Sequence, residues 1–151
     1  WQYFVGNVLS NSITGLVSVT TMFIVALSFF HLKMRGDYLS LIVLVILSTA
    51  VLFGIGLAVG GWAKNESQAA PLGNIVAFPM MFLSGSFFPR FLMPQWLQDV
   101  TQYIPLTPVI DGARMIITEG KTLFDIMPQV GLIALWGVVV YLIAFRVFRW
   151  E

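Results

Sequence analysis

Four long apolar runs divide the chain, and short polar connectors separate most of them. The runs cover about residues 8–30, 38–62, 69–88 and 126–148. An α-helix rises about 1.5 Å per residue and a bilayer core needs roughly 20 residues, so each run is long enough to cross a membrane. The runs are continuous rather than alternating, which favours helices over the strands of a closed barrel. The pattern therefore predicts an all-α membrane protein with four transmembrane helices.

The stretch before the last run has a different pattern and predicts a re-entrant helical hairpin at about residues 90–120. Between Pro94 and Ile104, apolar residues fall on one helical face and polar residues on the other, in a piece too short to span. Pro105 ends this piece, and Thr107 can cap a second short helix. A broken segment of this kind needs neighbouring protein to satisfy its backbone. The candidate hairpin residues are Ser84, Gly85, Pro89, Trp96, Pro105, Pro108, Asp111 and Arg114.

Asp111 and Arg114 lie three positions apart on the second short helix, so their side chains can pair. One interpretation is a plain surface ion pair, which contributes little stability. The other is a clamp that holds the hairpin, because a lone charge near a membrane edge is costly. Both interpretations stay open at this point.

Polar residues follow one face of the first apolar run at spacings of three and four. They are Asn7, Asn11, Thr14, Ser18 and Thr21. One interpretation is packing, because small and hydroxyl side chains let membrane helices approach and hydrogen-bond. The other is a substrate path, because polar groups in membranes face protein or water.

Glycine and proline punctuate the second and third runs. Gly56 and Gly60 lie four positions apart, a spacing that predicts close packing against another helix. Pro79 lies within the third run and should kink that helix, because proline cannot donate to the preceding turn. These residues predict contacts and shape rather than chemistry.

Composition agrees with a membrane location and removes several function classes. Hydrophobic residues make up 58% of the chain and charged residues 10%, against about a quarter charged in a soluble domain. Cysteine is absent and His31 is the one histidine, so a disulfide framework and a thiolate or histidine metal site are excluded. The net charge of +1 gives no reason to expect nucleic acid as a partner.

The sequence Gly-Lys-Thr at residues 120–122 is similar to the end of a phosphate-binding loop. That loop pattern needs glycine where Met115 stands, and no strand precedes it. We therefore expect no nucleotide site and no ATPase motif in this chain. Neither a starting methionine nor a charged leader region precedes the first run, so we expect a fragment cut upstream of Trp1.

Three motifs in the second half of the chain carry a family resemblance. They read FLSGSFFP at residues 82–89, MPQWLQ at 93–98 and YIPLTPVIDGARMI at 103–116. In combination they resemble the C-terminal half of type-2 ABC exporter permeases, the transmembrane subunits of ABC transporters. The resemblance implies that residues 1–151 are the C-terminal part of such a transmembrane domain and hold the third to sixth of its six helices.

The resemblance also implies a location, partners and a function. The chain would be a multi-pass protein of the plasma (inner) membrane, with the connector at Lys64 cytoplasmic and the hairpin outside, although charge alone leaves orientation open. Its partners would be an ABC ATPase subunit, a second permease subunit in a homo- or heterodimer, and the lipid bilayer. ATP and Mg²⁺ would bind the ATPase subunit, with no cofactor in this chain. The expected function is half of the translocation path of an ATP-driven exporter, without catalytic residues of its own.

Two alternative functions remain. One is a polytopic membrane anchor or assembly protein without a cargo path. The other is a membrane-embedded enzyme that uses Asp111 or His31 as acid or base. Against the enzyme, the sequence offers no second acid nearby and no set of histidine and cysteine for a metal.

Overall fold

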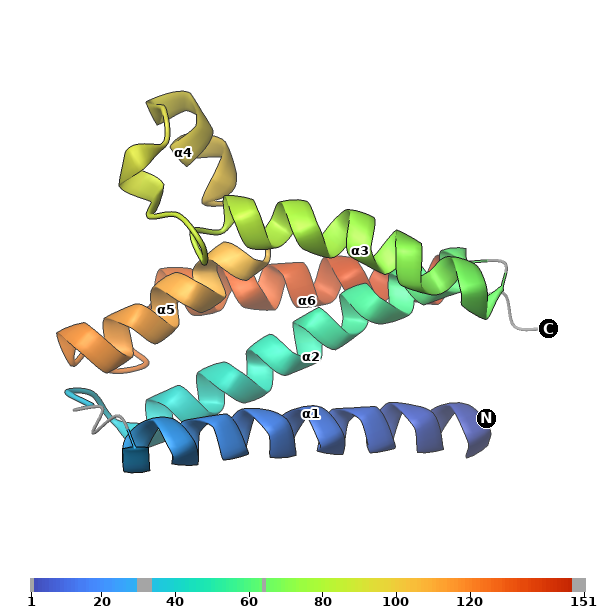
Figure 1. Ribbon diagram of the computed structural model, residues 1–151, viewed down its shortest axis with the longest axis horizontal. Helices are drawn as coiled ribbons and strands as arrows, with labels where there is room; N and C mark the ends of the chain where they lie inside the picture. Colours follow the sequence, from blue (N-terminus) through green and yellow to red (C-terminus); the bar gives the residue numbers. More distant parts are fainter. Residues whose placement is uncertain (1, 30–33, 64, 148–151) are drawn as a thin grey trace.

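The computed structural model describes residues 2–29, 34–63 and 65–147, which form helices and no strand (Figure 1). Expectations attached to Trp1, His31 and Lys64 fall outside the described residues. In chain order the helices are α1 (Gln2–Phe29), α2 (Tyr38–Trp62), α3 (Glu66–Leu83), the 3-10 helix η1 (Arg90–Leu92), α4 (Gln95–Thr101), α5 (Leu106–Glu119) and α6 (Met127–Val147). The all-helical fold is confirmed for this part of the chain.

Two helices, α2 and α6, are long and apolar enough to cross a membrane. The range of α2 is the same as the second predicted run, and α6 begins one residue after the start of the last run and continues to Val147, the last described residue. A shorter apolar stretch, Ile13–Met22, lies within α1. Asp37 fixes the start of α2, because its carboxylate accepts hydrogen bonds from the amides of Leu39 and Ser40, each at 3.3 Å.

The helix α3 stops at Leu83, before the third predicted run ends near residue 88. Gly85 explains the stop, because its φ of +86° lies in the left-handed region that glycine adopts without strain. Pro79 does lie inside α3 as expected. After α3 ends, the chain leaves the direction of that helix and forms a projecting segment before α5 begins (Figure 1).

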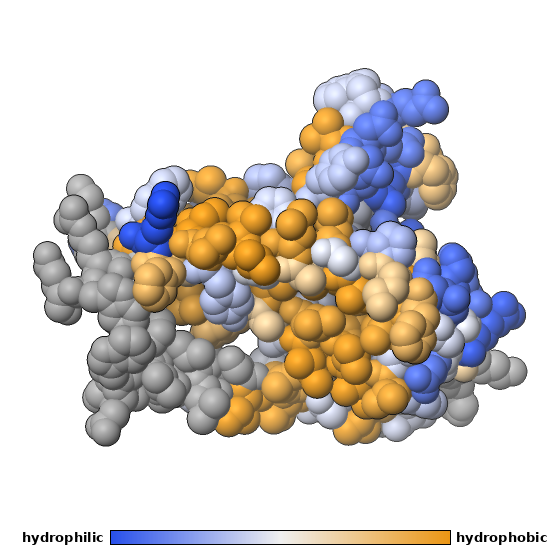
Figure 2. Space-filling model, turned by 180° about the vertical axis from the view of Figure 1, so that it is seen from behind, coloured by the Kyte–Doolittle hydropathy of each residue, from blue (hydrophilic) through white to orange (hydrophobic). Residues whose placement is uncertain are grey.

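The core lies where α2, α5 and α6 meet, and α5 packs against one end of the other two helices (Figure 1). The buried side chains of this cluster are Leu41, Leu44 and Val51 of α2, Ile116 of α5, Ile126 directly before α6, and Ile133 of α6. Elsewhere large apolar side chains face outward, and Figure 2 shows them spread over the rear of the helices. Such a surface suits a lipid environment, because a soluble protein rarely exposes large contiguous apolar patches.

The glycine face predicted on α2 consists of Gly56 and Gly60 with Gly54 and Gly61 extending it, and within the described residues close contact with α6 occurs at Gly54. A methyl group added at Gly54 would lie 3.1 Å from both Tyr141 Cε2 and Val140 Cγ1, whereas Gly56 and Gly60 have nothing within 4 Å in the described chain. The hydroxyl of Tyr141 also donates to the Ala50 carbonyl at 3.0 Å. Packing of Gly56 and Gly60 against another helix therefore stays a prediction, since no described residue fills that space.

This difference predicts opposite responses to the same substitution in one helix. Gly60→Ala should raise the thermal unfolding midpoint of the full-length permease, because alanine gains up to about 1 kcal/mol over glycine in a helix interior. Gly54→Ala should lower it, since Tyr141 or Val140 must move and overpacking typically costs about 1–3 kcal/mol. A fall for Gly60→Ala would contradict the prediction and indicate that a helix outside this chain packs on that face.

Candidate functional site

The hydroxyl groups of the polar stripe on α1 form hydrogen bonds with the backbone of the same helix. The hydroxyls of Thr14, Ser18 and Thr21 donate to the carbonyls four residues earlier, at 2.8, 2.8 and 2.7 Å. All three residues are exposed in the described chain, and the side chains of Asn7 and Asn11 fall outside it. The choice between packing and a substrate path therefore stays a prediction.

The other candidate residues come together around residues 84–105, a lateral segment that we call the arm. It contains η1 and α4 and stands off from α3, α5 and α6 (Figure 1). Ser84 and Gly85 are buried at its base, where Ser84 Oγ lies 3.0 Å from the Met81 carbonyl and 3.1 Å from Ser86 Oγ. Pro89 directly precedes η1 and is exposed. The base of the arm is therefore a defined turn rather than a loose loop.

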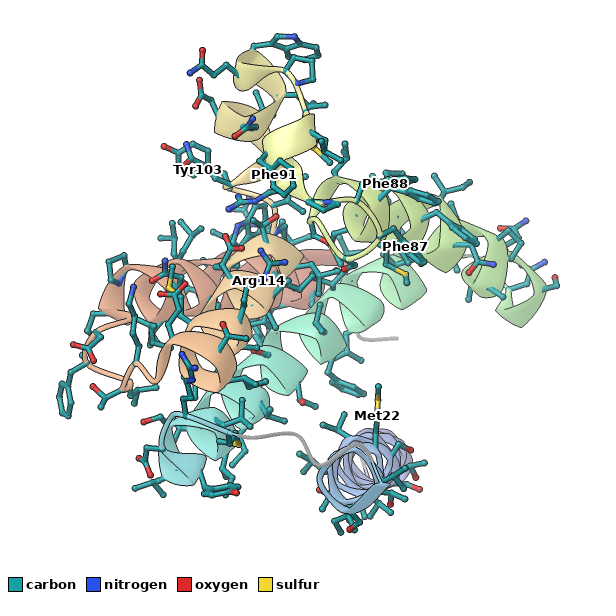
Figure 3. All side chains as sticks on the ribbon, turned by 60° about the vertical axis from the view of Figure 1, so that its left-hand side comes forward. Met22, Phe87, Phe88, Phe91, Tyr103 and Arg114 are labelled. Atoms are coloured by element: carbon teal, nitrogen blue, oxygen red, sulfur yellow. The ribbon has the colours of Figure 1, made fainter. Side chains whose placement is uncertain are left out.

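An ion pair joins the arm to α5. Arg90 of η1 donates from Nη2 to Oδ2 of Asp111, and the two side chains are only 26% and 16% exposed. The predicted pairing of Asp111 with Arg114 was wrong, because Arg114 points outward from α5 (Figure 3). In the clamp interpretation, the cation that pairs with Asp111 is therefore Arg90 of the arm.

Burial and charge act in opposite directions on the Asp111 carboxyl. Burial disfavours the charged form of this carboxyl, while the guanidiniums of Arg90 and Arg114 favour it. The ion pair therefore offsets part of the cost of burying this carboxylate. Through this contact with Arg90, Asp111 joins the arm to α5.

Two further hydrogen bonds hold the C-terminal end of the arm, where the chain returns to α5 and α6. The Thr107 hydroxyl of α5 donates to the Thr101 carbonyl at the end of α4 at 2.7 Å, and both residues are buried. Thr107 therefore ties α5 to α4 instead of capping α5, whose capping position is Pro105. From α6, Trp136 Nε1 donates to the Tyr103 carbonyl at 2.7 Å.

The bond from Trp136 places the turn between α4 and α5 along the length of α6. Trp136 lies nine residues after Met127, the first residue of this 21-residue helix. At 1.5 Å per residue this is about 14 Å from the start of α6, close to its middle. The turn therefore lies beside the middle of a helix that is long enough to span a membrane.

An apolar cavity of about 360 Å³ lies next to this turn. Ile104 and Pro105 line it together with residues of α2, α3 and α6, among them Ile55, Pro79 and Val140. Pro108 is buried at the first turn of α5, where its fixed φ and missing amide hydrogen are tolerated. The turn is thus surrounded by side chains of the longer helices rather than by solvent alone.

The outer surface of the arm combines aromatic and polar residues. Phe91 is 77% exposed and Trp96 is 68% exposed, and Figure 3 shows Phe91 and Tyr103 on the projecting segment. Within the short helix α4, the polar Thr101 is buried while Trp96 faces outward. Also exposed on the arm are Gln95, Asp99 and Gln102.

Sequence reasoning missed Arg90 and Trp136 as parts of this site. Arg90 carried a usable signal, because it follows an aromatic and proline-containing run and a cation there needs an anion nearby. Trp136 carried none, since a tryptophan within an apolar run is equally suited to lipid contact.

Comparison with known proteins identifies a family for the chain. Residues 1–118 match the family described as ABC-2 type transporter. The chain is 24% identical over 114 residues to the linearmycin resistance permease protein LnrN of Bacillus subtilis (strain 168), covering 76% of this chain and 30% of that protein. It is 31% identical over 105 residues to the inner membrane transport permease YhhJ of Escherichia coli (strain K12), covering 70% of this chain and 28% of YhhJ.

A third relative extends further along the chain. Identity to the inner membrane transport permease YadH of Escherichia coli (strain K12) is 27% over 130 residues, covering 85% of this chain and 48% of YadH. The chain thus spans less than half the length of these three relatives. No solved structure matches it significantly.

The chain belongs to the ABC-2 type transporter family, whose members are the membrane permeases of ABC transporters. This confirms the family that the three motifs indicated. A permease is a transport subunit and not itself an enzyme.

Proposed function

We propose that the chain is the C-terminal part of the transmembrane domain of an ATP-driven exporter and forms part of one half of its translocation path. The observation that carries this proposal is the family match over residues 1–118. The names of two relatives support export as the direction of transport. One is a resistance permease, and the other, YbhR of Escherichia coli (strain K12), is a probable multidrug ABC transporter permease. ATP and Mg²⁺ would bind a separate ATPase subunit, and a second permease subunit would complete the path.

The proposed topology has four crossings of an inner membrane, at about residues 8–30, 38–62, 69–88 and 126–148, with a re-entrant hairpin at about 90–120. The bond between Trp136 and the Tyr103 carbonyl supports the re-entrant part, because it sets the α4–α5 turn at the middle of α6. From there α5 runs outward along α2 and α6 to Gly120, whose φ of +72° ends the helix. Backbone at this depth is tolerated where protein satisfies it, as Thr107 and Trp136 do here.

The two interpretations of the α1 stripe lead to different expectations within this proposal. If the stripe lines the path, a bulky apolar side chain at Ser18 would obstruct cargo. If it serves packing, the same change would lower stability and leave transport per folded protein unchanged. The anchor alternative corresponds to no transport at all, with or without that change.

Purification of the full-length permease with its ATPase subunit tests the function. ATP hydrolysis by the ATPase subunit should rise when the permease joins it in a bilayer, and should depend on the permease remaining folded. Absence of association between the two subunits, or association without any change in hydrolysis, would contradict an ATP-driven transport role and favour a membrane anchor.

A further inference from the structure

We propose that the apolar cavity next to the α4–α5 turn binds one acyl chain of a membrane lipid, with the end of the chain against Ile104 and Pro105. The cavity, which we call the slot, has a volume of about 360 Å³ and is lined by residues of α2, α3, α6 and this turn. The inference goes beyond the proposed function, because it requires only that α6 crosses the bilayer and holds whether or not the chain transports a cargo.

The slot is elongated and closed at one end. Its lining includes residues 76–83 of α3 and 136–143 of α6, two helices that run beside each other in opposite directions (Figure 1). Seven residues of helix advance about 10 Å, so the slot follows both helices for about that length. Ile104 and Pro105 close it at the Trp136 end, because Trp136 bonds to the carbonyl of Tyr103, the residue before Ile104.

The other end of the slot opens onto the outer surface of the helices. Val140, in the middle of the α6 wall, is 5% exposed, and Trp136 at the closed end is half-buried. Val76 and Ile143 at the open end are 40% and 47% exposed, and Leu142 beside them on α6 is 63% exposed. The slot is therefore continuous with an apolar surface of the kind that faces lipid tails.

The chemistry of the lining selects a hydrocarbon occupant. Every described residue that lines the slot is apolar, and the indole Nε1 of Trp136 already donates to the Tyr103 carbonyl at 2.7 Å. An apolar cavity does not hold water, because water needs polar partners, and volume that stays empty destabilises the packing around it. A hydrocarbon group therefore suits the slot, whereas an ion or a polar ligand finds no partner there.

Size and depth favour a lipid chain over a helix from another part of the protein. A helical segment about 10 Å long and about 10 Å across would need roughly twice the volume of the slot. An engineered apolar cavity of about 150 Å³ binds one benzene ring, so the slot has room for a longer but thin hydrocarbon. The bilayer core supplies such chains along residues 136–143, which lie within the membrane-length helix α6.

A chain bound in the slot contacts the turn at which the arm returns to α5. Pro105 belongs to both the slot and this turn, and the bond from Trp136 to the Tyr103 carbonyl lies directly beside them. Bound lipid adds apolar contacts on the side of the turn that faces α3 and α6. The site therefore links the lipid around the permease to the position of the arm.

Photolabelling of the full-length permease tests the site, in phosphatidylcholine vesicles that include a phosphatidylcholine with a diazirine near the end of one acyl chain. Illumination should label Trp136 inside the slot as well as Leu142 on the outer surface. Ala58→Phe should lower the label at Trp136 by about tenfold or more, because the ring fills the slot from its α2 wall. Ala134→Phe is the matched control, since Ala134 is exposed on α6 and does not line the slot, and it should leave this label unchanged.

Two results would overturn the proposal. Label at Leu142 without label at Trp136 in the natural protein would show that a segment of protein closes the slot to lipid. Label at Trp136 that persists in Ala58→Phe would show that the chain reaches it by another route. Thermal unfolding of each variant monitors folding, and Ala58→Leu is a milder form if the larger ring prevents it. Stimulation of ATP hydrolysis, measured in the same vesicles with the ATPase subunit present, reports the transport function separately.

Discussion

Asp111→Ala should destabilise the full-length permease by about 2 kcal/mol and loosen the arm from α5. The change leaves the Arg90 guanidinium half-buried without its anion. Breaking a fully buried pair by removing one partner costs about 3–5 kcal/mol, and the partial exposure here reduces that value. The thermal unfolding midpoint and protease cleavage within residues 84–105 measure the two effects.

A double-variant cycle distinguishes this ion pair from a general loss of packing. Arg90→Ala/Asp111→Ala should be no less stable than the worse of the two single variants, because the second change removes a charge that the first left unpaired. Glu119→Ala is the control, since its pair with Lys121 is exposed and contributes about 1 kcal/mol or less. Losses that simply add would show that Arg90 and Asp111 act independently.

Gly36→Ala should destabilise the protein by about 2 kcal/mol or more, through a clash between the connector before α2 and the end of α5. A methyl group at Gly36 would lie 2.2 Å from the carbonyl oxygen of Ile116. That oxygen belongs to backbone, so relief requires a shift of the helix or of the connector, and overpacking of this kind typically costs about 1–3 kcal/mol. The hydrogen bond from the Arg35 amide to the Ile117 carbonyl, at 3.1 Å, would be strained as well.

Comparison with Gly60→Ala in thermal unfolding checks this prediction, because the same methyl group is added at an open position. Hydrogen exchange should also quicken at the Arg35 amide in the Gly36 variant. An unfolding midpoint equal to that of the natural protein would mean that the connector does not press against α5.

The sequence predicted α2 and α6 well because their apolar runs are continuous and end at clear signals. Asp37 stands at the start of α2 as a capping residue, and the run reaches Trp62 without a polar break. The end of α3 was missed, because nothing in an apolar composition shows that Gly85 adopts a left-handed φ. Local pattern thus gives helix positions better than it gives their last turn.

The ion pair at the base of the arm shows a second limit of sequence reasoning. Helical spacing indicates Arg114 as a partner for Asp111. The cation that binds Asp111 in the structure is Arg90, which lies 21 positions earlier. Such a contact depends on how the arm folds back onto α5, which no local spacing encodes. For the same reason the contact of Gly36 with Ile116 was not foreseen.

The three motifs around the arm nevertheless indicate the family from the amino-acid sequence, because they are specific in combination. The same residues form the turn at Ser84 and Gly85, the ion pair of Asp111 and the buried first turn of α5 at Pro108. All of them lie where the arm meets α3 and α5.

A spin label at Tyr103 in the full-length permease, reconstituted into a bilayer, measures most directly whether the α4–α5 turn enters the membrane. The chain has no cysteine, so Tyr103→Cys gives a single attachment site within it. Matched labels at Leu135 in the middle of α6 and at Glu119 at the end of α5 mark the depth scale. The re-entrant arrangement predicts that the Tyr103 label resembles that at Leu135, with high contact to dissolved oxygen and little to a water-soluble relaxation agent. A Tyr103 label as accessible to water as the one at Glu119 would contradict it.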